Sequence, residues 1–425
     1  MRQRQWRLRH ALSPLIAADS HAPARRVGWR FVLVYALAYT GTWIALLTPV
    51  LITIALKIRQ LTPGEAAGNH SLVLSVGAFF ALVSNPFFGR LSDRTTSRFG
   101  MRRPWLIGGV LGGAVALLIV ARADSVATVL VGWCLAQMSF NAVLAALVAV
   151  LPDQVPAEQR GTVAGVLGTC MPLGQLAGTF VVQSVAESTL AMFMVPALIG
   201  AAAILLLAIT LGDRQLDPTQ PVRATVSWYW VSPRRHPDFA WAWLSRFLVV
   251  LGTAFLTTYQ PFYLTEKLGL PDRAVPGLIF RSMLVQASMV VALSVIGGRL
   301  SDALQRRKAF VICGAIVYAI GLWMIALADS YALFLAGMAA TGIGHGLYFA
   351  VDLALVTEVL PDRQRDAAKD LGILNVTNAL PQSVAPALAP AILVLSGGDY
   401  AWLFFAAGAI ALGGSIAILP LKSVR

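Results

Sequence analysis

Long apolar stretches alternate with short polar segments along the whole chain. A helix needs about 20 mainly apolar residues to cross the hydrocarbon core of a bilayer, and twelve stretches approach or exceed this length. The first six are Phe31–Leu56, Ser71–Leu91, Trp105–Ala121, Ala127–Val150, Gly161–Val185 and Ala191–Leu211. The second six are Phe239–Leu264, Pro276–Gly297, Ala309–Ala328, Tyr331–Val356, Leu371–Leu395 and Tyr400–Leu419. The pattern predicts an all-α integral membrane protein with twelve transmembrane helices.

The composition agrees with a membrane location. Hydrophobic residues make up 57% of the 425 residues and charged residues only 12%, whereas soluble domains carry roughly 25% charged residues. A net charge of +13 would suit a protein that binds nucleic acid. The charges, however, occupy short segments between the apolar stretches, so we expect membrane lipid and no nucleic acid among the partners.

The distribution of Lys and Arg predicts the orientation in the membrane. Of the 33 such residues, 26 fall on the side of the two termini, five on the opposite side, and two, Arg246 and Arg281, within apolar stretches. Positive residues concentrate in short cytoplasmic segments. We therefore expect a multi-pass protein of the plasma (inner) membrane with both termini in the cytoplasm.

The second half of the chain repeats motifs of the first half in the same order. The repeated pairs are GRLSD at 89–93 and 298–302, DQVPAEQR at 153–160 and EVLPDRQR at 358–365, and Met-Pro at 171–172 and Leu-Pro at 380–381. Two homologous six-helix bundles would place a substrate site between them, near mid-membrane. The expected organisation is a tail at 1–30, a bundle at 31–211, a linker at 212–238, a bundle at 239–420 and a tail at 421–425.

Twelve spans with GRLSD after the second one resemble the major facilitator superfamily. The longer stretch GRLSDRTTSRFGMRRPW at 89–105 is similar to the glycoside–pentoside–hexuronide:cation symporters, including the sucrose:proton symporters. The resemblance implies two pseudo-symmetric bundles and secondary transport of a glycoside with a cation. Plant-type sucrose symporters carry an acidic residue in span four for proton coupling. The stretch Ala127–Val150 has Gln137 and Asn141 but no Asp or Glu, so the resemblance does not supply the coupling residue.

The loop motifs predict residues that control access from the cytoplasm. In the resembled family the aspartate of the GRLSD motif lies near the start of the eleventh helix, here near Leu371, and helps to hold the cytoplasmic side closed. Setting topology is the alternative role of the basic residues. Arg160 and Arg365 are expected to pair with nearby carboxylates such as Asp153 and Glu358. The candidate gating residues are Asp93, Arg94, Arg102, Arg103, Arg160, Asp302 and Arg365.

Ionisable residues within the apolar stretches are candidates for ion coupling, since such groups are costly in hydrocarbon unless they face a partner or a cavity. Asp352 and Arg246 lie at comparable depth, so an ion pair between them is possible. Proton coupling and a purely structural pair are both open for Asp352. His345, two turns from Asp352, either titrates, contacts substrate or bonds to a backbone carbonyl.

Amides and aromatic rings near mid-span predict a polar cavity, because sugars combine polar rims with apolar faces. Each of these side chains alone could instead join two helices. The candidate substrate-binding residues are Tyr39, Trp43, Gln137, Asn141, Gln175, His345, Tyr348, Asn378 and Gln382.

We predict a transporter of a small-molecule substrate and a coupling cation, working as a monomer, with import of a sugar or glycoside as the leading hypothesis. A proton-antiporting exporter of drugs or metabolites is the alternative. A membrane-embedded enzyme is not expected, because no HExxH-type motif or nucleophile–base constellation occurs. The three cysteines lie in apolar stretches without a CxxC motif, so we expect no metal or other cofactor.

Overall fold

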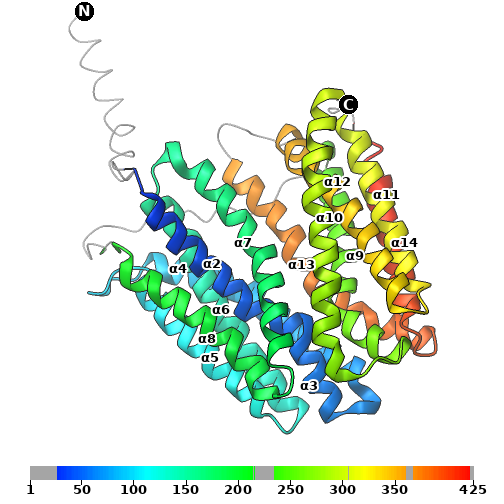
Figure 1. Ribbon diagram of the computed structural model, residues 1–425. Coiled ribbons are helices and arrows are strands. Elements are labelled where there is room, and N and C mark those ends of the chain that lie inside the picture. Colours follow the sequence, from blue (N-terminus) through cyan, green and yellow to red (C-terminus); the bar gives the residue numbers. More distant parts are fainter. Residues whose placement is uncertain (1–25, 214, 216–233, 305, 360–366, 422–425) are drawn as a thin grey trace, which may run out of the picture.

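The computed structural model describes residues 26–213, 215, 234–304, 306–359 and 367–421. Within these residues the fold consists of helices and connecting turns (Figure 1). The helices of the first half are α2 (Trp29–Thr48), α3 (Ile54–Leu61), α4 (Ala66–Asp93), α5 (Arg103–Arg122), α6 (Val126–Gln154), α7 (Ala157–Ser184) and α8 (Thr189–Thr210). Those of the second half are α9 (Pro237–Phe262), α10 (Val275–Leu304), α11 (Arg307–Ala326), α12 (Tyr331–Val359), α13 (Ala367–Leu395) and α14 (Ala401–Ala417).

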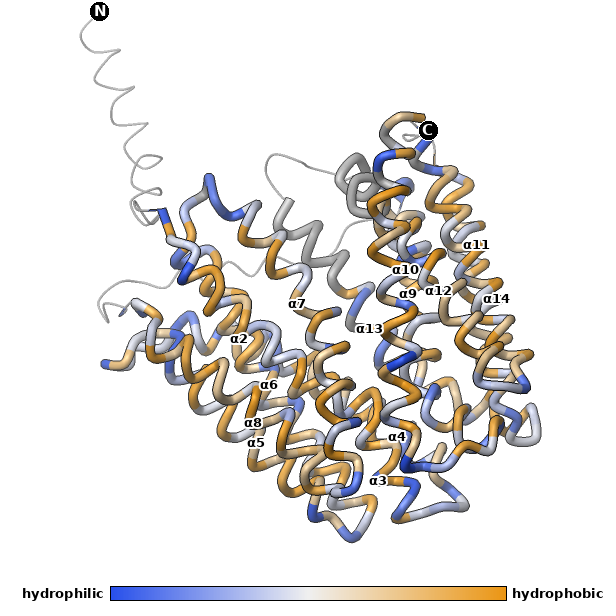
Figure 2. The backbone as a smooth tube through the Cα atoms, viewed as in Figure 1, coloured by the Kyte–Doolittle hydropathy of each residue, from blue (hydrophilic) through white to orange (hydrophobic). Residues whose placement is uncertain are grey.

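The twelve apolar stretches each fall on helix in the expected order. Among the described residues, eleven helical segments are long and apolar enough to cross a membrane, and Ala401–Ala417 is a shorter apolar helix of 17 residues. Hydrophobic residues follow the length of the helices, while hydrophilic residues gather towards their two ends (Figure 2). The outer faces expose large apolar side chains, for example Phe79, Val131 and Ile209, which suits contact with lipid. The predicted fold class is confirmed.

Two prolines accompany departures from regular α-helix at similar places in the two halves. Pro49 begins a π-helical turn, Pro49–Thr53, that joins α2 to α3. Pro261 lies at the end of α9, and a second π-helical turn, Tyr263–Lys267, follows directly. Proline removes a backbone donor from the helical hydrogen-bond ladder, and single π-turns are frequent at functional sites.

The two halves pack against each other mainly along two pairs of helices. Helix α4 packs against α13, and α7 packs against α10. Both described chain ends, before α2 and after α14, lie at the same end of the bundle (Figure 1). We call this the terminal end, and the end with α3, η3 (Tyr263–Lys267) and η4 (Asp272–Ala274) the opposite end.

Candidate functional site

Three amide side chains form a connected group inside the first half. Gln137 and Asn141, four residues apart on α6, are both buried. Asn141 donates from Nδ2 to the Gln137 carbonyl oxygen at 2.8 Å, and Asn85 on α4 donates to Asn141 Oδ1 at 3.4 Å. Gln137 and Asn141 therefore lie on one side of α6, as the sequence predicts, and this side is turned towards α4 near the middle of the helix.

Aromatic rings form a ladder along α2. The ring centroids of Tyr35 and Tyr39 are 6.1 Å apart, and those of Tyr39 and Trp43 are 6.4 Å apart. Trp43 Nε1 is buried and has no hydrogen-bond partner in the described structure. Gly174 on α7 lies directly against Trp43, because a Cβ at Gly174 would be 2.6 Å from Trp43 Cβ. Gln175, the next residue, is half-buried.

The second half brings a cation together with aromatic and amide groups. The Arg246 guanidinium on α9 lies 5.7 Å from the centroid of the Phe349 ring on α12 and donates to Asn378 Oδ1 on α13 at 3.4 Å. The His345 ring lies 4.6 Å from Phe349 and 5.0 Å from Tyr318. Three of the predicted residues, on three different helices, thus share one neighbourhood. A guanidinium over an aromatic face gains electrostatic stabilisation.

The remaining predicted residues of the second half are less clearly part of this group. Tyr348 is fully buried, and its hydroxyl lies 3.4 Å from Ser245 Oγ. Gln382 is half-buried on α13. Asp352 lies on α12, but its side chain falls outside the part of the structure that is described, so its pairing with Arg246 stays a prediction.

At the terminal end, Arg102 joins the ends of two helices. Its side chain is only 5% exposed and pairs with Asp93 of α4 at 2.7 Å and Asp153 of α6 at 2.8 Å. It also donates to Ser92 Oγ at 2.8 Å. All three partners of the buried guanidinium belong to the first half. Their charge-assisted hydrogen bonds hold the GRLSD segment against the end of α6.

The start of α5 receives a cap from the residues that follow α8. Asp213 accepts hydrogen bonds from the backbone N–H groups of Arg102 and Arg103, at 2.7 and 2.8 Å. A carboxylate is favoured beside unpaired amides at a helix N-terminus. Gly100, with φ of +104°, allows this approach, because a Cβ there would overlap Asp213. Arg103 also donates to the Leu211 carbonyl oxygen.

The expected pairing of Arg160 with Asp153 is wrong. Arg160 donates to the carbonyl oxygens of Val155 and Pro152, at 3.0 and 3.1 Å, whereas Asp153 is taken by Arg102. The reason is that Arg160 sits in the first turns of α7, beside the free carbonyls at the end of α6, which attract a cation. Arg94 is exposed.

Three gating predictions concern side chains beyond the described part of the structure. Arg365 and the side chains of Asp302 and Glu358 lie outside the described residues, as do those at the start of α13. The contact of Asp93 with that helix therefore stays a prediction for the state in which the terminal end is closed.

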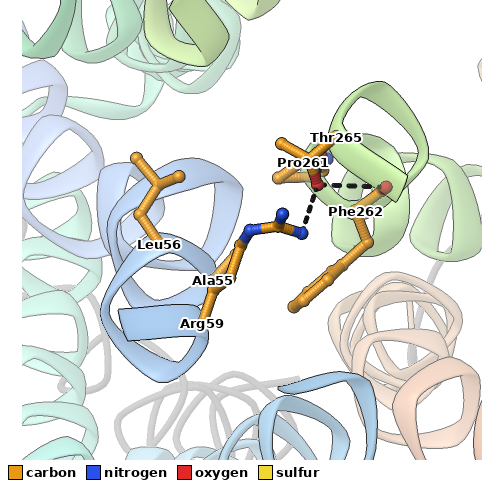
Figure 3. A pocket seen from close by; sticks show the side chains of 6 residues that line it. All are labelled: Ala55, Leu56, Arg59, Pro261, Phe262 and Thr265. Carbon is orange, nitrogen blue, oxygen red and sulfur yellow. Dashed lines mark hydrogen bonds between the residues drawn. The ribbon is translucent and has the colours of Figure 1, made fainter. Parts of the chain in front are cut away.

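Sequence reasoning missed a set of polar contacts between the halves at the opposite end. Arg59 on α3 pairs with Glu266 and Asp272 of the second half and donates to Thr265 Oγ1 at 2.8 Å. Its side chain reaches across to Thr265 beside Pro261 and Phe262 (Figure 3). The signal was present in the sequence, since Arg59 is one of only five basic residues on that side and acids face it. Nothing in the pattern, however, says which acid it meets.

The opposite end also holds a buried contact between α4 and α9. Ser71 Oγ and the Tyr259 hydroxyl lie 2.5 Å apart, and the neighbouring His70 ring packs on Tyr259 and Phe262. The hydrogen bonds of Arg59 and of Ser71 therefore both join the two halves at this end.

The sequence matches the family model of the Major Facilitator Superfamily over residues 31–293 and 278–424, nearly the whole chain. The chain belongs to the major facilitator superfamily. Members of this superfamily are transporters, and the fold described above agrees with that membership.

Curated relatives match only parts of the chain. An uncharacterised symporter of Synechocystis is 45% identical over 49 residues, 12% of this chain and 8% of that protein. The multidrug resistance protein MdtL of Citrobacter koseri is 30% identical over 142 residues, 33% of this chain and 34% of the relative. MdtL of Escherichia coli is 34% identical over 108 residues, 25% of this chain and 27% of the relative. The matches cover at most about a third of these relatives' length.

Solved transporters share the fold over almost the whole chain. A bacterial homologue of the human lysosomal transporter Spinster, in an inward-facing and unoccupied conformation, matches with a TM-score of 0.70 at 13% identity, covering 92% of this chain and 98% of that chain. The nucleoside transporter NupG matches with a TM-score of 0.69 at 11% identity, covering 92% and 99%. At these identities the likeness shows the fold alone.

Proposed function

We propose that this chain is a secondary active transporter of the plasma membrane that moves a small polar solute, a sugar or glycoside, by alternating access and together with a proton or sodium ion. We place it in the glycoside–pentoside–hexuronide:cation group, as a monomer without catalytic activity, and with the terminal end in the cytoplasm. The long match of its second loop to that group supports the assignment.

The observation that carries the proposal is the matching depth of the polar groups in the two halves. Counting about 1.5 Å per helical residue, Arg246 and Asn378 lie roughly 14 to 17 Å from the terminal ends of their helices. Trp43 and Asn141 lie roughly 20 Å from theirs. These depths fall near the middle of a hydrocarbon core about 30 Å thick. Amides, a cation and aromatic rings at mid-depth suit a hydroxyl-rich solute.

Uptake of labelled disaccharides into cells that express the protein tests the proposal. Accumulation above the external concentration that a protonophore or sodium removal abolishes would support it. The variant Gln137→Ala should lower the uptake rate about tenfold, the cost of one hydrogen bond to substrate. Gln215→Ala is the matched control, since Gln215 bonds to the Arg98 carbonyl at the terminal end and should leave uptake unchanged.

Asp352 is the proposed coupling residue, with Arg246 as its partner and His345 as the alternative titrating group. Asp352→Asn should abolish uphill accumulation and preserve energy-independent exchange of solute across the membrane. Normal concentrative uptake by this variant would contradict coupling through Asp352. Loss of both activities with normal membrane insertion would favour a structural ion pair.

Export of drugs or metabolites against a proton gradient is the second candidate function. The partial matches to proteins named multidrug resistance protein favour it. In that case cells expressing the protein would accumulate less of a cationic dye than control cells, and a protonophore would remove the difference. Disaccharide uptake would be absent.

A further inference from the structure

A histidine without hydrogen bonds is enclosed where the two halves meet. His70, on the second turn of α4, is 0% exposed, and neither Nδ1 nor Nε2 has a hydrogen-bond partner in the described structure. Two rings of α9 cover it: its centroid lies 5.0 Å from that of Phe262 and 6.2 Å from that of Tyr259. Buried polar groups are nearly always paired, so this site departs from the rule.

The charge of this ring must depend on whether the halves are together. An imidazolium carries two N–H donors and a positive charge, and both need acceptors or water. The closed interface supplies neither, because no acceptor in the described structure forms a hydrogen bond with either nitrogen of the ring. The ring is therefore neutral while α4 and α9 are in contact. Separation of the halves would bring water to both nitrogens.

No charged side chain of the neighbouring elements, within the described structure, forms a hydrogen bond that could stabilise a protonated His70 in place of water. Tyr259, the titratable side chain that faces the ring from α9, bonds to Ser71. On α3, Lys57 donates to the Ala121 carbonyl oxygen and Arg59 is bound to Glu266 and Asp272. Glu65 of η2 (Pro63–Glu65) and Cys134 of α6 make no hydrogen bond to the ring. The described side chains of α13 after residue 376 include no titratable group.

We propose that His70 is a proton-binding residue of the opposite end: it is neutral when the halves are closed there and takes up a proton when they separate. Protons would then favour the state that is open at this end. The inference rests on the alternating access proposed above, and adds a titrating group distinct from Asp352 and His345. It makes the step that exposes the site to the far side of the membrane dependent on pH.

The distance across the opposite end, measured without any substrate, tests this directly. Spin labels at Gln60→Cys and Arg273→Cys, exposed residues of the two halves at this end, would be placed in the full chain with the native cysteines replaced by alanine. Pulsed electron resonance in lipid nanodiscs would then give the populations of short and long distances. An exposed histidine titrates near pH 6.5. Lowering the pH from 8 to 5.5 should therefore raise the ratio of open to closed about tenfold.

Two substitutions of His70 separate titration from packing. His70→Gln keeps a polar side chain, and His70→Phe keeps an aromatic ring on Phe262. Both should make the distance distribution independent of pH. His236→Gln, the same change just before α9, should leave the tenfold response in place. A pH response that survives in both His70 variants, or its absence in the parent, would overturn the proposal. A normal response without uptake of any tested solute would overturn the proposed function instead.

Discussion

The two ends of the molecule are held together in different ways. At the opposite end, polar contacts join one half to the other, through Arg59 with Glu266 and through Ser71 with Tyr259. At the terminal end, the strongest polar contacts stay inside the first half, where Arg102 binds Asp93 and Asp153. In the alternating access proposed above, contacts within a half survive the motion of the two halves, whereas contacts between the halves break. Substitutions at the terminal end should therefore lower stability, and those at the opposite end should shift a conformational equilibrium.

The largest expected effect is at Arg102. Arg102→Gln removes a buried guanidinium and leaves two carboxylates close together without their cation, so the free energy of unfolding should fall by about 3 kcal/mol. Thermal unfolding of the purified protein in detergent would show this as a clear drop in Tm. Arg94→Gln is the matched control, because Arg94 is exposed and should change Tm little. Equal effects of the two changes would mean that the Arg102 contacts do not stabilise the half.

A smaller effect is expected at Arg59. Arg59→Gln removes both ion pairs with the second half, which are partly exposed and together contribute on the order of 1.4 kcal/mol to the closed state. The ratio of open to closed at the opposite end should rise about tenfold, with Tm almost unchanged. The spin-label pair described above measures it. Arg122→Gln, an exposed cation at the same end, should not shift the ratio. A fall in Tm without opening would place Arg59 among the structural contacts.

The smallest effect concerns a pair within the second half. Burial raises the pKa of Asp399, but the Ala401 backbone N–H and the Lys267 ammonium together outweigh it and hold the pKa below its usual range. A lowered carboxyl pKa means that the stabilisation is present above the ordinary value near 4 and is lost as pH falls through the lowered one. Asp399→Asn should lower the free energy of unfolding at pH 7 by less than about 1 kcal/mol, because the pair is so exposed, and Tm should fall slightly. The difference between the two proteins should shrink as the pH falls below 4 and vanish once the pH is below the lowered pKa of Asp399. A difference that persisted in acid would exclude the ion pair as its cause.

The helices could be predicted because hydrophobic length is a local property of the chain. Each stretch from Phe31–Leu56 to Tyr400–Leu419 lies on a helix, since a lipid-facing segment must satisfy its own backbone hydrogen bonds. The cluster of Gln137 with Asn141 also follows from local spacing. The contact of Arg246 with Asn378 does not, because it joins α9 to α13.

The contacts that the sequence could not predict depend on tertiary geometry or on conformation. In the sequence, Arg160 is close to two kinds of acceptor, the Asp153 carboxylate and the backbone carbonyls at the end of α6. Which of them it binds depends on how the ends of α6 and α7 are placed in the fold. Arg59 and Glu266 are 207 residues apart in the sequence, and their contact joins the two halves. One sequence specifies every conformation that a transporter adopts. A sequence pattern therefore does not tell in which conformation a given contact forms.

The π-helical turn after Pro49 determines the direction in which Arg59 points. A π-turn holds one residue more than an α-turn, so every residue after it is displaced around the helix axis by one position, about 100°. Removing one residue from Pro49–Thr53 would change the phase of α3 and rotate Arg59 away from Glu266 by that angle. The extra residue of the π-turn therefore determines on which side of α3 Arg59 lies, and so whether its guanidinium can pair with the acidic residues of the second half.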